Sequence, residues 1–292
     1  MIVLKEKPKV GFIGIGVMGR SMASLLLQAG YELVIYNRTK QKAEALIEKG
    51  AIWCDTVCDV AKQADVIITI IGYPKDVEEV YLGEDGLLAC AKKGAYCIDM
   101  TTSSPLLAET IYEQGKEKGI HILDAPVSGG DIGAKNGTLS IMVGGDKEDF
   151  EAVFPLFQVM GENIIYHGKA GNGQHTKMCN QISFAAGMIS VAESMAYAKK
   201  AGLDQHKVLE SITKGAAASW TLSNLAPRMI EGDFEPGFYI KHFLKDIRIA
   251  LEVAETMNLE MPGLTLVKSM YEKLVEQGEE NSGTQAIYKL IV

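Results

Sequence analysis

The stretch KVGFIGIGVMGRSM, Lys9 to Met22, decides the fold class because it joins a buried strand to a helix through a glycine-rich turn. Its centre, GIGVMG, is a G-x-G-x-x-G motif. Gly14 permits the tight turn, Gly16 lets backbone approach a pyrophosphate, and Gly19 lets helix and strand pack closely. Because phosphate binds at helix N-termini, the motif predicts a dinucleotide site rather than a merely tight turn, with contacts from Gly14, Ile15, Gly16, Val17, Met18 and Gly19.

The chain around this motif alternates between strand-like and helical runs. Residues 9–15 and 32–36 are typical of strands, and residues 17–29 and 39–49 are typical of helices. Apolar or β-branched runs with helical or looped segments between most of them continue the series at 66–71, 95–99, 120–125 and 139–143. The series predicts an α/β fold with a doubly wound, mostly parallel sheet of the Rossmann type.

The pattern changes after Tyr166. Gly171 and Gly173 precede a long segment with helical spacing that has no breaker until Gly202, and the runs 205–213, 222–230, 242–257 and 264–277 also have helical spacing. A chain of 292 residues is long enough for two domains. We therefore predict a dinucleotide-binding Rossmann domain over 1–168 and an all-helical substrate and oligomerisation domain over 169–292, joined through the long helix.

The composition excludes several classes of protein. Hydrophobic residues make up 47% and charged residues 23% of the chain, and the longest apolar run, VIITII, has only strand length, so no membrane segment is expected. The N-terminal MIVLKEKPKV has no signal-peptide pattern, which predicts a cytoplasmic protein. A net charge of -8 disfavours a nucleic-acid surface.

The five cysteines, an odd number, argue against a disulfide framework. Cys54 and Cys58 form a C-x3-C pair, but no second Cys or His pair stands at zinc-ligand spacing. We therefore expect structural thiols.

The end of the second strand predicts which dinucleotide binds. This position usually carries an acid that accepts hydrogen bonds from the adenine ribose, and here it is Asn37. Arg38, Thr39 and Lys40 follow, so a guanidinium, a hydroxyl and an ammonium replace the carboxylate that would repel a 2′-phosphate. The residues favour NADP over NAD and predict cofactor contacts from Asn37, Arg38 and Thr39. The alternative is that Arg38 is a solvated charge at a helix start.

Two other strand ends carry candidate residues, because open α/β sheets bind ligands at the carboxyl ends of their strands. Ile71 and Gly72 would lie along the dinucleotide. In DAPVSGG, a hydroxyl and consecutive backbone N–H groups converge on one point, an arrangement that suits a carboxylate; its candidate residues are Ser128, Gly129 and Gly130. A strand-ending turn without a ligand is the alternative for this segment.

Five motifs in order along the chain resemble the β-hydroxyacid dehydrogenase family. They are GFIGIGVMGRSM, the NRT at 37–39, DAPVSGG at 124–130, GNGQHTKMCNQ at 171–181 and FLKDIRIA at 243–250. The family includes 3-hydroxyisobutyrate dehydrogenase, tartronate semialdehyde reductase and the succinic and glyoxylic semialdehyde reductases. 6-Phosphogluconate dehydrogenase is a more distant relative. The resemblance implies an NAD(P)-dependent oxidoreductase in which residues 128–130 bind the substrate, Thr102 lies beside the cofactor, Lys245 lies at the cofactor or active-site cleft, and Asp246 supports it.

Lys177 is the predicted proton donor and acceptor. Oxidising an alcohol by hydride transfer requires a group that takes the hydroxyl proton, and the resemblance assigns the family's catalytic lysine to this position. The positive helix end and partial burial would lower its pKa. Asn180 and Gln181, three and four residues further on, can face the same side and bind the substrate. Some relatives carry Asn where Gln181 stands, so which amide binds is open.

The glycines before Lys177, Gly171 and Gly173, are expected to give cofactor and substrate close access to the first helical turns. His175 points about 200° away from Lys177 around a helix and is not expected to be catalytic. The other histidines show no pairing at metal-ligand spacing, so no metal site is expected. By spacing alone Lys245 and Asp246 would be a surface pair, and Lys241 is a candidate for selecting the far end of the substrate.

Four hypotheses follow. The first is an NADP-dependent reductase of small semialdehydes, or oxidiser of β-hydroxy acids, that acts on a small carboxylate substrate as a homodimer or homotetramer. The second is an imine reductase, against which Lys177 and DAPVSGG argue together. The third is a noncatalytic NADP-binding protein of the same fold. The fourth is decarboxylation as in 6-phosphogluconate dehydrogenase, but only Arg228 and Arg248 follow Arg38 to hold a sugar phosphate.

Overall fold

The computed structural model describes residues 7–292 and divides the chain into two compact units, Met1–Lys177 and Met178–Val292. Each unit has its own hydrophobic core: two buried clusters lie in the first unit and one in the second. We describe the units separately.

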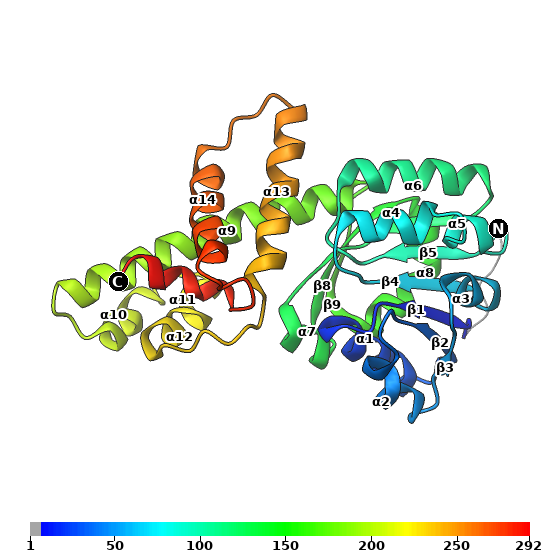
Figure 1. Ribbon diagram of the computed structural model, residues 1–292, viewed down its shortest axis with the longest axis horizontal. Coiled ribbons are helices and arrows are strands. Elements are labelled where there is room, and N and C mark those ends of the chain that lie inside the picture. Colours follow the sequence, from blue (N-terminus) through cyan, green and yellow to red (C-terminus); the bar gives the residue numbers. More distant parts are fainter. Residues whose placement is uncertain (1–6) are drawn as a thin grey trace. The chain divides into compact units, whose positions relative to one another are not determined.

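The first unit is built on a mixed sheet with the strand order β3-β2-β1-β4-β5-β6-β8-β7, in which β9 pairs with β8 (Figure 1). The strands are β1 Val10–Ile13, β2 Leu33–Tyr36, β3 Ile52–Trp53, β4 Val66–Thr69, β5 Tyr96–Asp99, β6 His121–Asp124, β7 Val127–Ser128, β8 Leu139–Gly145 and β9 Gly161–Tyr166. The six strands β3-β2-β1-β4-β5-β6 are parallel to one another, whereas β8 is antiparallel to β6 and β7. Since β1 has β2 on one side and β4 on the other, the strand order reverses there, which is where open α/β sheets bind ligands.

Helices cover both faces of this sheet. Successive residues of a strand point to opposite faces, and because they are apolar on both, each face packs against helices. Phe12 belongs to the cluster that contains residues of α1 and α8, and its neighbour Ile13 belongs to the cluster with residues of α3, α4 and α6. The helices are α1 Val17–Gln28, η1 Lys40–Ala43, α2 Glu44–Ile47, α3 Val57–Gln63, α4 Pro74–Leu82, α5 Leu87–Cys90, α6 Pro105–Glu117, α7 Gly130–Asn136 and α8 Lys147–Met160.

The doubly wound, mostly parallel architecture predicted from the sequence is confirmed, with differences in detail. The helix expected over 39–49 is the 3-10 turn η1 followed by the single-turn α2. The expected strand at 139–143 extends to Gly145 and runs antiparallel to β6. Strands β3, β7 and β9 had no prediction, since two-residue strands have almost no periodicity and only three of the six β9 residues are apolar.

The second unit is all helical, as predicted. The long helix α9, Asn172–Lys200, starts in the first unit and continues into the second, whose further elements are α10 Gln205–Ile212, α11 Trp220–Asn224, α12 Ala226–Glu231, α13 Ile240–Thr256, α14 Pro262–Glu276 and η2 Thr284–Leu290. The helix expected over 222–230 is divided between α11 and α12, because Pro227 has no N–H to continue a helix and occupies the first turn of α12.

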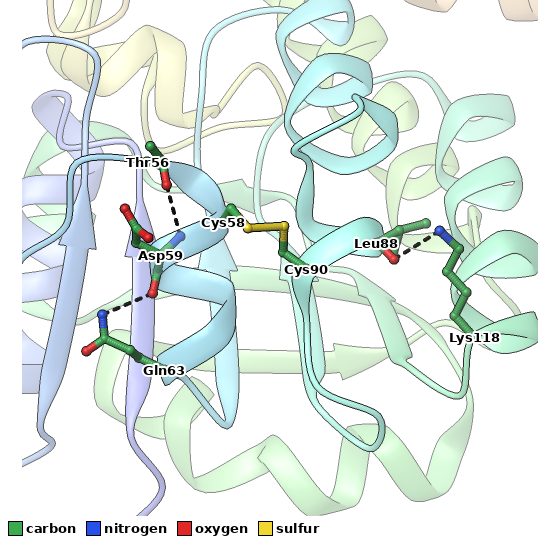
Figure 2. The surroundings of a disulfide bond; sticks show 7 residues. All are labelled: Thr56, Cys58, Asp59, Gln63, Leu88, Cys90 and Lys118. Atoms are coloured by element: carbon green, nitrogen blue, oxygen red, sulfur yellow. Dashed lines mark hydrogen bonds between the residues drawn. A yellow bond between two sulfur atoms is a disulfide. The ribbon is translucent and has the colours of Figure 1, made fainter.

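Cys58 in α3 and Cys90 in α5 form a disulfide (Figure 2). The expectation that all cysteines are thiols is therefore wrong for these two. Their 32-residue separation in the sequence gave no local signal for the pairing. Cys54 and Cys97 are buried thiols and Cys179 is an exposed one. Between residues 7 and 292, no helix has both the length and the apolar character needed to cross a membrane.

Candidate active site

The glycine-rich turn between β1 and α1 contains two glycines that packing within the protein requires and one that faces open space. At Gly14, with φ +102°, a Cβ would lie 2.1 Å from the Ile70 carbonyl oxygen, and at Gly19 a Cβ would lie 1.9 Å from the Gly14 carbonyl oxygen. At Gly16 a Cβ would meet nothing within 4 Å. Packing therefore explains Gly14 and Gly19, whereas Gly16 leaves open space at the start of α1, where N–H groups without helical partners attract phosphate. The turn fits a dinucleotide.

Asn37 ties the end of β2 to this turn. Its Oδ1 accepts a hydrogen bond from the Ile15 N–H at 3.0 Å, and its Nδ2 donates to the Thr39 carbonyl at 2.8 Å. The Arg38 side chain is 79% exposed and places Nη1 3.3 Å from Asp76 Oδ1, on α4. The Lys40 ammonium lies 5.2 Å from the centre of the Trp53 indole. The residue that follows β2 is thus an amide and not an acid, while the carboxylate beside Arg38 comes from α4.

The carboxyl ends of β4 and β5 are joined by side chains that follow them. Ile71 N–H donates to Thr101 Oγ1 at 2.9 Å. Asp99, which ends β5, accepts from Thr69 Oγ1 at 2.8 Å and from Thr101 N–H at 3.1 Å. These bonds fix the backbone leading to Thr102, which is half-buried. The candidate cofactor residues Ile71 and Thr102 therefore lie on neighbouring strand ends.

The start of α9 is anchored at the same edge of the sheet. Asp124, the last residue of β6, accepts from Gly171 N–H on Oδ1 and from Gln174 N–H on Oδ2, both at 2.8 Å. Gln174, fully buried, accepts from Ser103 N–H at 2.9 Å and donates to the Thr101 carbonyl at 2.7 Å. Burial raises the pKa of Asp124 to about 7, against the opposing effect of these N–H donors and with a further increase from the charge of Asp99.

Gly171 and Gly173 are glycines because of this anchoring. A Cβ at Gly171, where φ is +84°, would lie 2.9 Å from Glu109 Cγ, and one at Gly173 would lie 2.4 Å from the Met142 carbonyl oxygen. Both glycines are buried. The expectation that they give ligands access to the helix is wrong, because the space beside them is filled by the protein itself.

Lys177 is on the second turn of α9 and is only 6% exposed. It stands three residues after Gln174, and residues at this spacing share a face of a helix. Gln174 bonds to the backbone at Thr101 and Ser103, so the first turn of α9 lies beside the chain that follows β5. His175 is half-buried, and burial lowers the pKa of its imidazole.

Ser128, Gly129 and Gly130 form the turn from β7 into α7. Ser128 is half-buried and is paired with Ser140 on β8. Gly129, with φ +130°, and Gly130, with φ +64°, are exposed, and a Cβ at Gly130 would meet nothing within 4 Å. The backbone of this turn is thus open to a ligand, and only glycine adopts these angles readily.

A second group of candidate residues lies in the second unit. Gln181 is 2% exposed; its Nε2 donates to Asp246 Oδ2 at 2.5 Å and its Oε1 accepts from Asn180 Nδ2 at 2.7 Å. Lys245 Nζ lies 2.8 Å from Asp246 Oδ1, and both side chains are largely buried. The interpretation of Lys245 and Asp246 as a surface pair is therefore wrong. Lys241, the candidate for selecting the far end of the substrate, donates a hydrogen bond to Asn281 Oδ1 at 2.8 Å in an exposed position.

Sequence reasoning missed three residues that shape the site: Asp76, Asp124 and Gln174. Asp124 lies within DAPVSGG and had no predicted role of its own, although a carboxylate at a strand end is a signal for capping. Gln174 bonds to Ser103, which lies 71 positions earlier in the chain, and Asp76 pairs with Arg38, which lies 38 positions earlier. Pairings over such distances in the sequence have no local signal. Over residues 7–292 no cluster of three or more His, Cys, Asp or Glu side chains is placed to hold a metal ion.

The comparisons with known proteins agree with this architecture. Residues 9–168 match the NAD binding domain of 6-phosphogluconate dehydrogenase, and residues 171–291 match the domain described as NAD-binding of NADP-dependent 3-hydroxyisobutyrate dehydrogenase. The chain is 67% identical to the uncharacterised oxidoreductase YkwC of Bacillus subtilis over 98% of this chain and 99% of that protein.

Two further comparisons reach proteins with a named activity. The chain is 39% identical to 2-hydroxy-3-oxopropionate reductase of Escherichia coli, over 92% of each protein. It is also similar to the solved structure of Mycobacterium tuberculosis 3-hydroxyisobutyrate dehydrogenase with L-serine, with a TM-score of 0.90 and 27% identity over 97% of this chain and 99% of that one.

Proposed function

Since the chain belongs to the β-hydroxyacid dehydrogenase family of NAD(P)-dependent oxidoreductases, we propose that it interconverts short carboxylate-bearing semialdehydes and β-hydroxy acids with a preference for NADP. The observation that carries this proposal is a buried lysine, Lys177, at the carboxyl edge of a sheet whose glycine turn fits a dinucleotide. The E. coli relative is named for the reductase activity on 2-hydroxy-3-oxopropionate, a compound of this chemical class.

The proposed cofactor site is formed by the residues that follow β1, β2, β4 and β5, namely 14–19, 37–39, 71, 72 and 102, together with Lys245. The preference for NADP rests on Asn37, whose amide replaces an acid, and on the exposed guanidinium of Arg38. When bound, the cofactor supplies the hydride to the aldehyde carbon or accepts it from the alcohol.

The proposed role of Lys177 is to move the proton at the substrate oxygen. Its ammonium donates to the carbonyl oxygen as the aldehyde is reduced, and the neutral amine takes the hydroxyl proton back in the reverse direction. Its burial keeps bulk water away from that proton. The hydrogen bonds that anchor the first turn of α9 to Asp124 and to the Thr101 carbonyl support this role, because Lys177 follows Gln174 by three residues on the same helix.

The proposed substrate site uses Ser128, Gly129 and Gly130 for the carboxylate. Of the two candidate amides, we favour Asn180 as the substrate contact, because both ends of the Gln181 amide are already hydrogen-bonded within the second unit. Gln181 would then orient Asn180: the Asp246 carboxylate holds Gln181 Nε2, which turns Gln181 Oε1 toward Asn180.

We propose residues 1–168 as the NADP-binding domain and 169–292 as the substrate and oligomerisation domain of a cytoplasmic homodimer or homotetramer. Large apolar side chains exposed on the second unit support self-association: Tyr197 is 73% and Trp220 62% exposed. An imine reductase and a noncatalytic NADP-binding protein remain the alternative functions, and the buried Lys177 argues against both.

The test is an NADPH oxidation assay against glyoxylate, succinic semialdehyde, tartronate semialdehyde and methylmalonate semialdehyde, with NADH in parallel. We expect rapid oxidation with at least one aldehyde, and a higher kcat/KM with NADPH than with NADH. Oxidation of NADPH by a cyclic imine but by none of the four aldehydes would favour the imine reductase. A higher kcat/KM with NADH would contradict the cofactor preference.

A further inference from the structure

Asp76, on the first turn of α4, faces the cation that the proposed function assigns to the 2′-phosphate. Its Oδ1 lies 3.3 Å from Arg38 Nη1, and the two side chains are 23% and 79% exposed. An ion pair this exposed contributes little to stability. The guanidinium is therefore able to turn from the carboxylate to another anion at small cost.

The carboxylate of Asp76 does not depend on Arg38 for its position. Asp76 Oδ2 accepts a hydrogen bond from the Tyr73 N–H at 3.1 Å and so forms part of the capping box at the start of α4. At Gly72, which follows β4, a Cβ would lie 3.0 Å from the same Oδ2, so the backbone passes close beside it. When Arg38 turns away, the negative charge stays at the end of the site.

We propose that Asp76 is a specificity-determining residue that limits the preference for NADP by competing with the 2′-phosphate for Arg38. This inference rests on the proposed function, in which Arg38 binds that phosphate. NADP brings a dianionic group toward a fixed carboxylate, and the like charges repel through the partly screened protein surface. NAD carries a neutral 2′-hydroxyl and escapes the repulsion, so the enzyme keeps affinity for both cofactors.

The test is the dissociation constant of NADP+ and of NAD+, measured by isothermal titration calorimetry on the full chain and on Asp76→Asn. The asparagine keeps an oxygen for the Tyr73 N–H, so the α4 cap and the thermal unfolding temperature should be retained. We expect tighter NADP+ binding by roughly tenfold, the order expected for removing one like charge at such an exposed site, and an unchanged NAD+ constant.

Glu78→Gln is the matched control, because it removes the same charge from an exposed position on the same helix. Its NADP+ constant should stay close to that of the wild type, and raising the salt concentration should shrink the difference between Asp76→Asn and wild type. If Asp76→Asn binds NADP+ no more tightly than wild type, or if Glu78→Gln gains as much as Asp76→Asn, the inference is wrong.

The variant Arg38→Ala distinguishes a failure of the role proposed for Asp76 from a failure of the assignment of Arg38 to the 2′-phosphate. A loss of NADP+ affinity in Arg38→Ala, together with no gain in Asp76→Asn, would overturn the role of Asp76 alone. No loss in Arg38→Ala would overturn the assignment of Arg38 to the 2′-phosphate, and the proposal for Asp76 with it. In the double variant Arg38→Ala, Asp76→Asn, the gain should be smaller than in Asp76→Asn, since the contested cation is absent.

Discussion

Gly16 and Gly19 belong to one motif but are glycine for different reasons. Gly19 must be glycine for the fold, since a Cβ there would lie 1.9 Å from a backbone oxygen of Gly14, which cannot move aside as a flexible side chain can. Gly16 has open space in front of it, so the fold alone does not require glycine. We therefore propose that a cofactor phosphate approaches the backbone at Gly16.

Alanine substitutions should separate these two requirements. Gly19→Ala is expected to destabilise the first unit by about 2 kcal/mol or more, through overpacking at a site without room. Gly16→Ala should unfold at nearly the wild-type temperature but bind NADPH at least about tenfold more weakly, since its methyl fills the cradle. Thermal unfolding and calorimetric titration check both. Wild-type NADPH affinity in Gly16→Ala would show that no phosphate approaches there.

Asp124 gives a pH dependence of stability whose sign can be worked out. Its pKa is raised by burial to about 7 from an ordinary value of 3.8. The unfolded chain therefore loses the proton near pH 4, whereas the folded chain keeps it until about pH 7. The contribution of this group is fully present below pH 4 and is lost progressively as the pH rises to about 7.

The free energy of unfolding, measured by urea titration between pH 4.5 and pH 8, should show this loss by comparison with Asp124→Asn, which has no proton to lose. The wild type should lose a few kcal/mol relative to the variant over this range, because the unfolded chain gives up its proton first and each pH unit between the two pKa values costs about 1.4 kcal/mol. A constant difference between the two proteins would mean that Asp124 titrates normally.

At the scale of elements, the first turn of α9 is held on the sheet by backbone contacts as well as by Asp124. A Cβ at Gly173 would lie 2.4 Å from the Met142 carbonyl oxygen and 2.6 Å from the Asp124 carbonyl oxygen. Further along the same helix, a Cβ at Gly187 would make ordinary contact with Thr221 Oγ1 at 3.4 Å. Two glycines of one helix thus differ in whether a side chain fits.

Gly173→Ala should displace the first turn of α9 and lower both stability and the rate of aldehyde reduction, since Lys177 follows one turn later. We expect a loss of about 2 kcal/mol or more and a kcat reduced by at least about tenfold. Gly187→Ala is the control and should be neutral or stabilising by up to about 1 kcal/mol, from helix propensity. Equal effects of the two substitutions on kcat would show that the docking of the first turn does not matter.

The disulfide between Cys58 of α3 and Cys90 of α5 (Figure 2) closes the segment of chain that contains β4 and α4. In the chain-entropy description, closing a loop of this length stabilises the folded state by about 3 to 4 kcal/mol. Reduction with dithiothreitol should therefore lower the unfolding temperature of the wild type. The unfolding temperature of Cys58→Ser should lie below that of the oxidised wild type and should not change when the reductant is added. A wild-type unfolding temperature that does not respond to complete reduction would contradict this.

The elements that could be predicted from the sequence are those whose signal is local. The strands over 10–13, 33–36, 66–69 and 96–99 show as apolar runs between helical segments, and the glycine motif fixes the turn that follows the first of them. The antiparallel direction of β8 and its pairing with β9 were not predictable, because strand direction and pairing depend on residues far apart in the chain. The Cys58–Cys90 bond and the Asp76–Arg38 pair were missed for the same reason.

At the scale of the whole molecule, the residues proposed for the chemistry are divided between the two units and are linked by α9. The candidate cofactor residues other than Lys245 belong to the first unit, and Asn180, Gln181 and Lys245 to the second. Lys177 is the last residue of the first unit. The same helix thus carries the proposed proton donor and the proposed substrate amide, one turn apart.

The measurement that tests the central claim most directly is kcat for the best aldehyde in Lys177→Met, taken together with its dissociation constant for NADPH. Methionine has an apolar chain of similar length to that of lysine, so it can occupy the same buried position, but it has no ammonium group to donate a proton. His175→Ala, two residues away on the other side of the helix, is the matched control and should react at nearly the wild-type rate. We predict that Lys177→Met binds NADPH like the wild type but reduces the aldehyde about 100-fold to 10,000-fold more slowly. A kcat within twofold of the wild type would contradict the assignment of Lys177 as the proton donor.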